Sequence, residues 1–229
     1  MTTVELGCQS FADPVLKASG RGHRVADAVS SATFLRQKSL RLGIQLMPGL
    51  PATTTGEALV SLDAALQLKP DFLRVYPTVV LQGTQLASLW RQGLFSPLDL
   101  DAAVEICADI ELVCHRHAVP VIRYGLQSNE NLDSGAVLAG PYHPAFGQLV
   151  KSRLWRRALN RLQHDLIDTI EVHPAEISDA LGHRRNNLHY LQRQNRPFTI
   201  RSGPHVQKGF VDVGGKTCCM NSLAAGKGD

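Results

Sequence analysis

The stretch Leu42-Gly43-Ile44-Gln45-Leu46-Met47-Pro48-Gly49-Leu50-Pro51 decides how the rest of the chain can fold. Its apolar first half has the length of one buried strand, and the Pro-Gly-x-Pro sequence prevents that strand from continuing. Beyond the loop, Thr54 and Glu57 have the spacing of a capping box, and the apolar positions of residues 58–66 fit one helix face. The stretch therefore predicts a strand, a tight loop and a helix in that order.

The same alternation recurs through the first part of the chain. Short apolar runs at residues 4–8, 42–46 and 72–76 end in loops, and segments of helical composition separate them. Strands that alternate with helices are typical of parallel βαβ units. We therefore expect an α/β fold whose strand ends meet at one edge, where loop N–H groups are available to a ligand.

Composition limits the class of protein. The 229 residues are 44% hydrophobic and 19% charged, as in an ordinary globular protein. No run approaches the roughly 20 apolar residues of a membrane span, and no basic region followed by an apolar one begins the chain. Five irregularly spaced cysteines argue against a disulfide framework. We expect a cytoplasmic protein with reduced thiols and no membrane contact.

The net charge of +4 is unevenly distributed. Residues 1–150 carry 11 Lys and Arg against 13 Asp and Glu, a balance of −2, whereas residues 151–208 carry 11 against 5, a balance of +6. A basic segment favours a polyanionic partner such as RNA, although a solvated helix face rich in arginine is an equally open interpretation. The candidate phosphate contacts are Arg156, Arg157, Arg184, Arg185 and Arg193.

A turn-rich joint, Gly140-Pro141-Tyr142-His143-Pro144, suggests a domain boundary. We expect one domain over residues 1–139 and a small basic α+β module over residues 140–213. Residues 214–229 are rich in glycine, lysine and small side chains, which predicts a flexible tail.

Four segments together resemble the radical S-adenosylmethionine (radical SAM) enzymes. They are VELGCQSF at residues 4–11, SGRGH at 19–23, GIQLMPGLP at 43–51 and GPYHPAFG at 140–147. Within that family the chain looks most like the elongator-type branch, whose members modify wobble uridine in tRNA, and less like oxygen-independent coproporphyrinogen oxidase. The resemblance implies a role in tRNA modification.

The resemblance also implies a particular fold and cofactor. It predicts the C-terminal half of a partial (β/α)6 TIM-like barrel, with the strands at residues 4–8, 42–46 and 72–76 as strands four to six. A small α+β module follows this half-barrel. S-adenosylmethionine would lie across the carboxyl ends of the strands.

Seven residues match the cofactor-binding positions of the family. Gln9 and Arg21 match positions that hold the aminoacyl end of the cofactor, and Gln45 matches a position near the ribose. The backbone that packs on the adenine corresponds to Met47, Pro48, Gly49 and Leu50. Arginine suits a carboxylate because its guanidinium donates two parallel hydrogen bonds, and glutamine donates and accepts without a charge. A solvated cation at Arg21, and structural hydrogen bonding at the two glutamines, are the alternatives.

The family cleaves its cofactor at a [4Fe–4S] cluster held by three cysteines in a C-x3-C-x2-C loop. That spacing is absent from the 229 residues, and Cys114-His115-Arg116-His117 offers too few ligands for zinc. We therefore expect no metal site, no catalytic residue and no activity of this chain alone. Either a separate chain supplies the N-terminal half, or the sequence is a truncated product. An RNA-binding module and an inert remnant are the alternatives to an enzyme.

Overall fold

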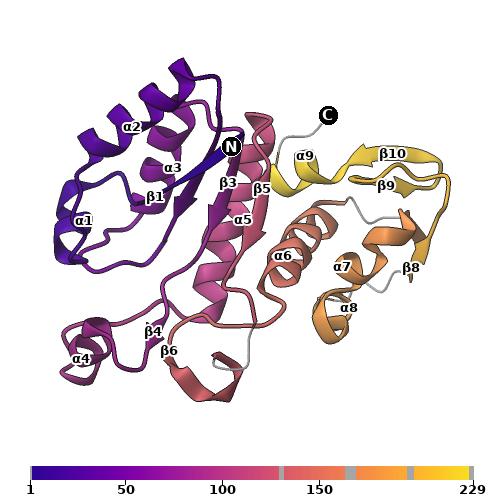
Figure 1. Cartoon of the computed structure of the whole chain (residues 1–229). Coiled ribbons are helices and arrows are strands. Elements are labelled where there is room, and N and C mark those ends of the chain that lie inside the picture. Colours follow the sequence, from indigo (N-terminus) through magenta and orange to yellow (C-terminus); the bar gives the residue numbers. More distant parts are fainter. Residues whose placement is uncertain (1, 129–131, 163–168, 195–198, 227–229) are drawn as a thin grey trace. The chain divides into compact units, whose positions relative to one another are not determined.

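The computed structural model describes residues 2–128, 132–162, 169–194 and 199–226 (Figure 1). The chain divides into two compact units, Met1–Phe146 and Gly147–Asp229, each with a sheet of its own. Among the residues described, no helix is both long enough and apolar enough to span a membrane.

Four parallel strands form the main sheet of the first unit, in the order β1-β2-β3-β5. The strands are β1 (Thr3–Gln9), β2 (Arg41–Leu46), β3 (Phe72–Val75) and β5 (Val121–Tyr124). The helices between them include α2 (Val25–Gln37), α3 (Glu57–Gln67) and α5 (Leu100–Arg116). The expected α/β fold with parallel strands is confirmed.

One face of this sheet forms the core beneath the helices. Ile44 and Leu73 are paired in adjacent strands, and each is 0% exposed. Helix α2 contacts β1 and β2, α3 contacts β2, and α5 contacts β5 and α3 (Figure 1). Because successive side chains of a strand point to opposite faces, Gln45 and Arg74 lie on the other face, where both are partly exposed.

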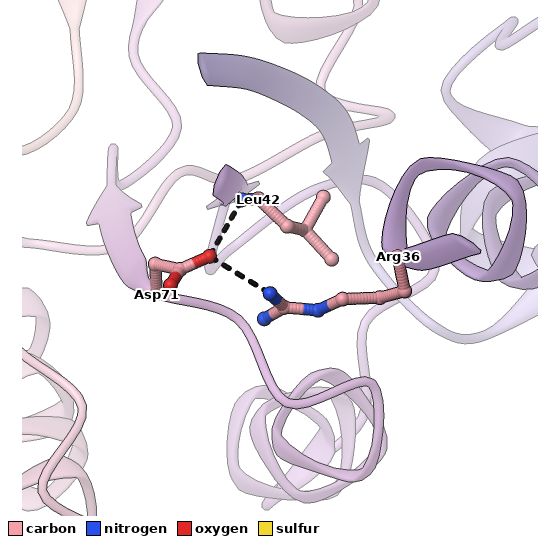
Figure 2. A network of polar contacts seen from close by, with 3 residues as sticks. All are labelled: Arg36, Leu42 and Asp71. Carbon is pink, nitrogen blue, oxygen red and sulfur yellow. Dashed lines mark hydrogen bonds and ion pairs between the residues drawn. The ribbon is translucent and has the colours of Figure 1, made fainter. Parts of the chain in front are cut away.

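Asp71 fixes the amino-terminal edge of the sheet (Figure 2). Its Oδ2 accepts hydrogen bonds from Arg36 Nη1 at 3.0 Å and from the backbone N–H of Leu42 at 2.7 Å. These bonds join the end of α2, the second residue of β2 and the residue that precedes β3. The bond from Leu42, aided by the charge of Arg36, lowers the pKa of Asp71 below its ordinary value.

Smaller elements complete the first unit. They are α1 (Asp13–Ala18), β4 (Val80–Leu81), α4 (Gln85–Arg91), a π-helix (Leu132–Ala136) and β6 (Val137–Ala139). Strands β4 and β6 pair antiparallel. We did not predict this ribbon, because strands of two and three residues are too short to show a periodic pattern.

The start of α3 differs from the predicted capping box. The residue before the helix is Gly56, whose φ is +85°, and no side chain caps the helix. Glu57 turns instead into the interior, where its carboxylate accepts hydrogen bonds from Ser10 and Ser61. The prediction from Thr54 is wrong because the hydroxyl groups of Ser61, one helical turn on, and of Ser10, 47 residues earlier in the chain, bind the glutamate instead.

The second unit contains a sheet in the order β10-β9-β7-β8. Its strands are β7 (Thr169–Val172), β8 (Thr199–Ser202), β9 (Phe210–Val213) and β10 (Lys216–Cys219). The helices are α6 (Phe146–Arg161), which begins at the last residue of the first unit, then α7 (Ile177–Leu181), α8 (Asn186–Arg193) and α9 (Met220–Ala225). Two short 3-10 turns lie at Pro174–Glu176 and His183–Arg185.

Residues 216–225 form a strand and a helix, not the predicted flexible tail. Gly214 and Gly215 have φ values of 59° and 84°, so they form a two-residue loop that pairs β10 antiparallel with β9. Arg161 then holds α9 by donating from Nη1 to the carbonyl oxygens of Leu223 and Ala224. The prediction relied on glycine content alone, whereas two consecutive glycines between short strands also indicate a hairpin loop. Residues 227–229 lie outside the described part of the chain.

Candidate functional site

Gln9 ends β1 in an uncommon backbone conformation. Its φ is 60°, and the pairing of β1 with β2 shifts between Gly7 and Gln9. The side chain folds back over Gly7, because a Cβ added at Gly7 would lie 2.4 Å from Gln9 Nε2. The missing side chain at Gly7 therefore provides the space that the Gln9 amide fills.

The Gln9 side chain has an unmet hydrogen-bonding capacity. The residue is 8% exposed, and within the described part of the chain its Oε1 is buried without a hydrogen-bond partner. Leaving a buried acceptor unpaired costs about 1–3 kcal/mol, so such a group suggests that a donor arrives from elsewhere. A ligand ammonium or N–H group at this edge fits that need.

Gln45 and Met47 adjoin Gln9 at the carboxyl edge of the sheet. Gln45 Oε1 lies 4.0 Å from the position that a Gly7 Cβ would take, and so approaches the same space as Gln9. The backbone N–H of Met47 donates to the carbonyl oxygen of Gln9 at 2.7 Å. The ends of β1 and β2 are thus held side by side.

The loop after Met47 is packed on both sides. The carbonyl oxygen of Pro48 accepts from the backbone N–H of Thr78 at 2.9 Å. Gly49 has a φ of +82°, and a Cβ there would lie 2.7 Å from Leu98 Cδ1, so only glycine fits without strain. Leu50 is 6% exposed. The segment of residues 48–50 is therefore held in a fixed conformation close to Gln9.

Arg21 reaches the same edge from the loop after α1. The residue is exposed, and its Nη2 donates to Met47 Sδ at 3.4 Å. It borders a cleft of about 860 Å³, lined by Asp13, Pro14, Lys17, Arg21, Gly22, His23, Arg24 and Asp27. Both carboxylates of the cleft bind backbone N–H groups at the start of α2, each at 2.8 Å. The cleft therefore has three cationic side chains, Lys17, Arg21 and Arg24, beside two carboxylates that are already hydrogen-bonded.

A buried polar network, which the sequence did not predict, lies behind this edge. Ser10 and Ser61 each donate to Glu57 Oε1 at 2.5 Å, and Ser61 Oγ accepts from the backbone N–H of Phe11 at 2.7 Å. The network fixes the backbone immediately after Gln9. Glu57 and Ser61 are four residues apart on the buried face of α3, and polar residues at that helical spacing were the available signal.

The cysteines do not fit an iron–sulfur cluster. We call Cys8, Cys107 and Cys114 the core cysteines; all are buried. Burial raises the pKa of Cys8 to about 11 and that of Cys114 to about 12, and it raises the pKa of Cys107 further. The described residues also contain no group of three His, Cys, Asp or Glu side chains able to hold a metal. We therefore derive no reaction step through a cluster on this chain.

The five arginines of the predicted RNA contacts occupy different elements. Arg156 and Arg157 lie on α6, and the Arg156 guanidinium is 5.1 Å from the centre of the Tyr190 ring. Arg184 and Arg185 have consecutive positive φ values of 51° and 60°, just before α8. Arg193 ends α8, about 12 Å further along the helix axis. The arginines therefore do not converge on one point.

Part of the sequence matches a model of a known protein family. Residues 70–156 match the Radical_SAM C-terminal domain family. The matched stretch includes β3 and β5 of the main sheet and much of α6. This stretch of the chain is thus similar to the C-terminal domain of radical SAM proteins.

Within this class the chain is similar to elongator-type proteins. It is 32% identical to the tRNA uridine(34) acetyltransferase of Methanocaldococcus infernus over 113 residues, which is 46% of this chain and 20% of that protein. For the enzyme of the same name from Dehalococcoides mccartyi the identity is 34% over 113 residues, covering 48% of this chain and 25% of the relative. The chain is also 32% identical to Elongator complex protein 3 of Mus musculus over 115 residues, which is 48% of this chain and 20% of that protein.

A solved structure has the same fold. It is Elp3 from Methanocaldococcus infernus with an N-terminal deletion, and the TM-score is 0.60 at 24% sequence identity. The match covers 77% of this chain and 40% of that one. The resemblance to elongator-type radical SAM proteins is therefore confirmed for their C-terminal region, and the chain spans less than half of the relatives it matches.

Proposed function

We propose that the chain binds S-adenosylmethionine at the carboxyl edge of β1 and β2, as part of an elongator-type radical SAM protein that acts in tRNA modification. The observation that carries the proposal is the buried, unpaired Oε1 of Gln9 beside Gln45, Met47 and Arg21. The family match and the names of the tRNA-modifying relatives support the ligand and the substrate class. In this proposal the four parallel strands are part of a partial (β/α)6 barrel.

Each residue has a role that suits its chemistry. Arg21 donates two parallel hydrogen bonds to the carboxylate of the ligand, because a guanidinium fork matches that geometry. Gln9 Oε1 accepts a hydrogen bond from the ammonium group, which satisfies its buried acceptor. Gln45 binds the ribose hydroxyls, and residues 47–50 form the surface for the adenine.

In this proposal the residues of the chain bind S-adenosylmethionine but do not supply the electron for its reductive cleavage. A [4Fe–4S] cluster provides the electron that cleaves the sulfonium in radical SAM chemistry, and the thiols described here do not fit one. We propose that the cluster ligands come from outside these 229 residues and that the chain by itself is inactive.

Isothermal titration calorimetry of the 229-residue chain tests the proposal. S-adenosylmethionine should bind, and Arg21→Gln should weaken its affinity about tenfold or more, because a bond to a charged group contributes about 1.5–3 kcal/mol. Methylthioadenosine lacks the aminoacyl group, so its affinity should not change in that variant. Arg91→Gln, at an exposed arginine of α4, is the matched control. Equal loss for both ligands, or no binding by the parent chain, would contradict the assignment.

A non-catalytic RNA-binding module is a second candidate. Its support is the balance of +6 over residues 151–208 together with the two strained arginines, Arg184 and Arg185. Uncommon backbone conformations of this kind cluster at binding sites. A gel shift with bulk tRNA should show binding that weakens steeply with salt. Absence of retardation at low salt would eliminate this candidate.

A further inference from the structure

The face of the main sheet opposite to Ile44 and Leu73 carries two neighbouring arginines. Gly7 is paired with Gln45, Gln45 with Arg74, and Arg74 with Arg123 across β1, β2, β3 and β5. The β3–β5 register shifts by one residue just before Arg74. Because Tyr124 donates to Glu111 of α5, Arg123 points away from that helix, to the side of Arg74. We call Glu5, Gln45, Arg74, Tyr76 and Arg123 the polar face. The Gln9 side chain, which folds over Gly7, borders this face.

Arg74 is only partly neutralised. Its Nε lies 3.3 Å from Glu5 Oε2, and its Nη1 donates to the Tyr76 hydroxyl at 3.3 Å. The ion pair reaches from β3 to β1 across β2, which has only Gly43 at the level of Glu5. The side chain of Arg74 remains 37% exposed.

Arg123 has no such compensation. It is exposed, and within the described ranges of the chain it makes no hydrogen bond and no ion pair. It also stands directly beside Arg74 on the neighbouring strand. Like charges in adjacent strand positions repel, and Glu5 offsets this repulsion only in part, so an anion bound between the two arginines would stabilise the pair.

In the next row toward the amino ends of the strands, Glu5, Gly43 and Phe72 are paired. The Phe72 ring fills the space beside Gly43, because a Cβ there would lie 2.3 Å from Phe72 Cζ, and Phe72 is 7% exposed. The Phe72 ring and the Glu5 carboxylate therefore disfavour an anion in that row. Two strand spacings, about 10 Å, separate Arg123 from Gln45 at the proposed cofactor edge.

We propose that Arg74 and Arg123 form a subsite for a phosphate group of the nucleotide substrate, on the polar face next to the cofactor edge. This inference rests on the proposed function, because it places the substrate beside S-adenosylmethionine. Arginine forks bind phosphate through paired hydrogen bonds. Glu5 weakens the affinity of the subsite for phosphate, because it pairs with Arg74 and because its negative charge repels the phosphate.

Titration of uridine 5′-monophosphate and of uridine into the 229-residue chain, in low-salt buffer free of phosphate, tests the subsite. The monophosphate should bind at least tenfold more tightly than the nucleoside. Arg123→Gln should remove most of that difference, and Arg123→Lys should restore part of it. Arg116→Gln, at the exposed end of α5, changes the net charge equally and should leave the affinity unchanged.

Glu5→Gln provides the sharper test. Removing this carboxylate frees Arg74, so the affinity for the monophosphate should rise two- to fivefold, whereas a merely structural ion pair would give no gain. Circular dichroism melts confirm that each variant is folded. Equal affinity for monophosphate and nucleoside, equal loss in Arg116→Gln, or weaker binding in Glu5→Gln would overturn the proposal. S-adenosylmethionine affinity, measured in parallel, shows separately whether the cofactor assignment fails.

Discussion

Alanine at position 7 should weaken ligand binding while it leaves the fold nearly unchanged. The added Cβ would lie 2.4 Å from Gln9 Nε2 and 3.6 Å from Gln9 Cδ, and no backbone atom lies within 4 Å among the nearest contacts. The end of a flexible side chain can move, so the methyl group displaces the Gln9 amide and leaves β1 intact. Alanine also lowers the conformational entropy of the unfolded chain relative to glycine, which offsets about 0.5–1 kcal/mol of any loss of stability.

The magnitude follows from the bonds that Gln9 would lose. One or two hydrogen bonds to the ligand contribute about 0.5–1.5 kcal/mol each, so the affinity for S-adenosylmethionine should fall about tenfold. The free energy of unfolding should change by less than about 1 kcal/mol, since the displaced amide also leaves a site where its oxygen was unpaired. Titration calorimetry and urea unfolding measure the two quantities.

Gly43→Ala is the matched comparison on the neighbouring strand. Its Cβ would lie 2.3 Å from Phe72 Cζ and 2.4 Å from Cε2, and this buried ring cannot move aside. Overpacking of this kind costs about 1–3 kcal/mol, so this variant should lose stability instead. Full ligand affinity in Gly7→Ala, or an equal loss of stability in both variants, would refute the reasoning.

Three further predictions concern stability and thiol chemistry. Glu57→Ala should lower the free energy of unfolding by about 2–3 kcal/mol because it leaves two buried hydroxyls without their acceptor, whereas Glu57→Gln keeps an oxygen and should cost less than about 1 kcal/mol by urea unfolding. Because the pKa of Asp71 is lowered in the folded state, its stabilisation is present above the ordinary value of 3.8 and is lost as the pH falls through the folded pKa. Unfolding at several pH values should therefore show Asp71→Asn about 1 kcal/mol less stable at pH 7, with the difference shrinking below pH 4; a constant difference would contradict this. Ellman's reagent at pH 8 should modify the half-buried Cys218 and Cys219 of the native chain before the core cysteines, and early reaction of all five thiols would show that the core is open.

Local sequence was sufficient for the main sheet. The run Leu42 to Leu46 is apolar and Pro48 and Pro51 interrupt it at once, so both the strand and its loop could be predicted from residues near one another. The position of the proposed cofactor site was inferred from the same principle, because the ends of parallel strands meet at one edge. The structure places Gln9, Arg21 and Met47 there through direct contacts.

Features that depend on distant partners could not be predicted in this way. Glu57 has the spacing of a capping residue, and only the fold shows that Ser10, the residue after β1, binds it. The polar face needs the register of four strands before Arg74 and Arg123 become neighbours. The left-handed backbone of Gln9 likewise arises from the β1–β2 shift, and no residue type near it signals that conformation.

The most direct test of the proposed cofactor site is the NMR spectrum of the chain labelled with 15N in its glutamine side chains. We predict that S-adenosylmethionine shifts the side-chain amide signals of Gln9 and Gln45, assigned through Gln9→Leu and Gln45→Leu. The signal of Gln67, at the exposed end of α3, should not move. Shifts at Gln67 or elsewhere, with the Gln9 and Gln45 signals unchanged at saturating ligand, would contradict binding at the ends of β1 and β2.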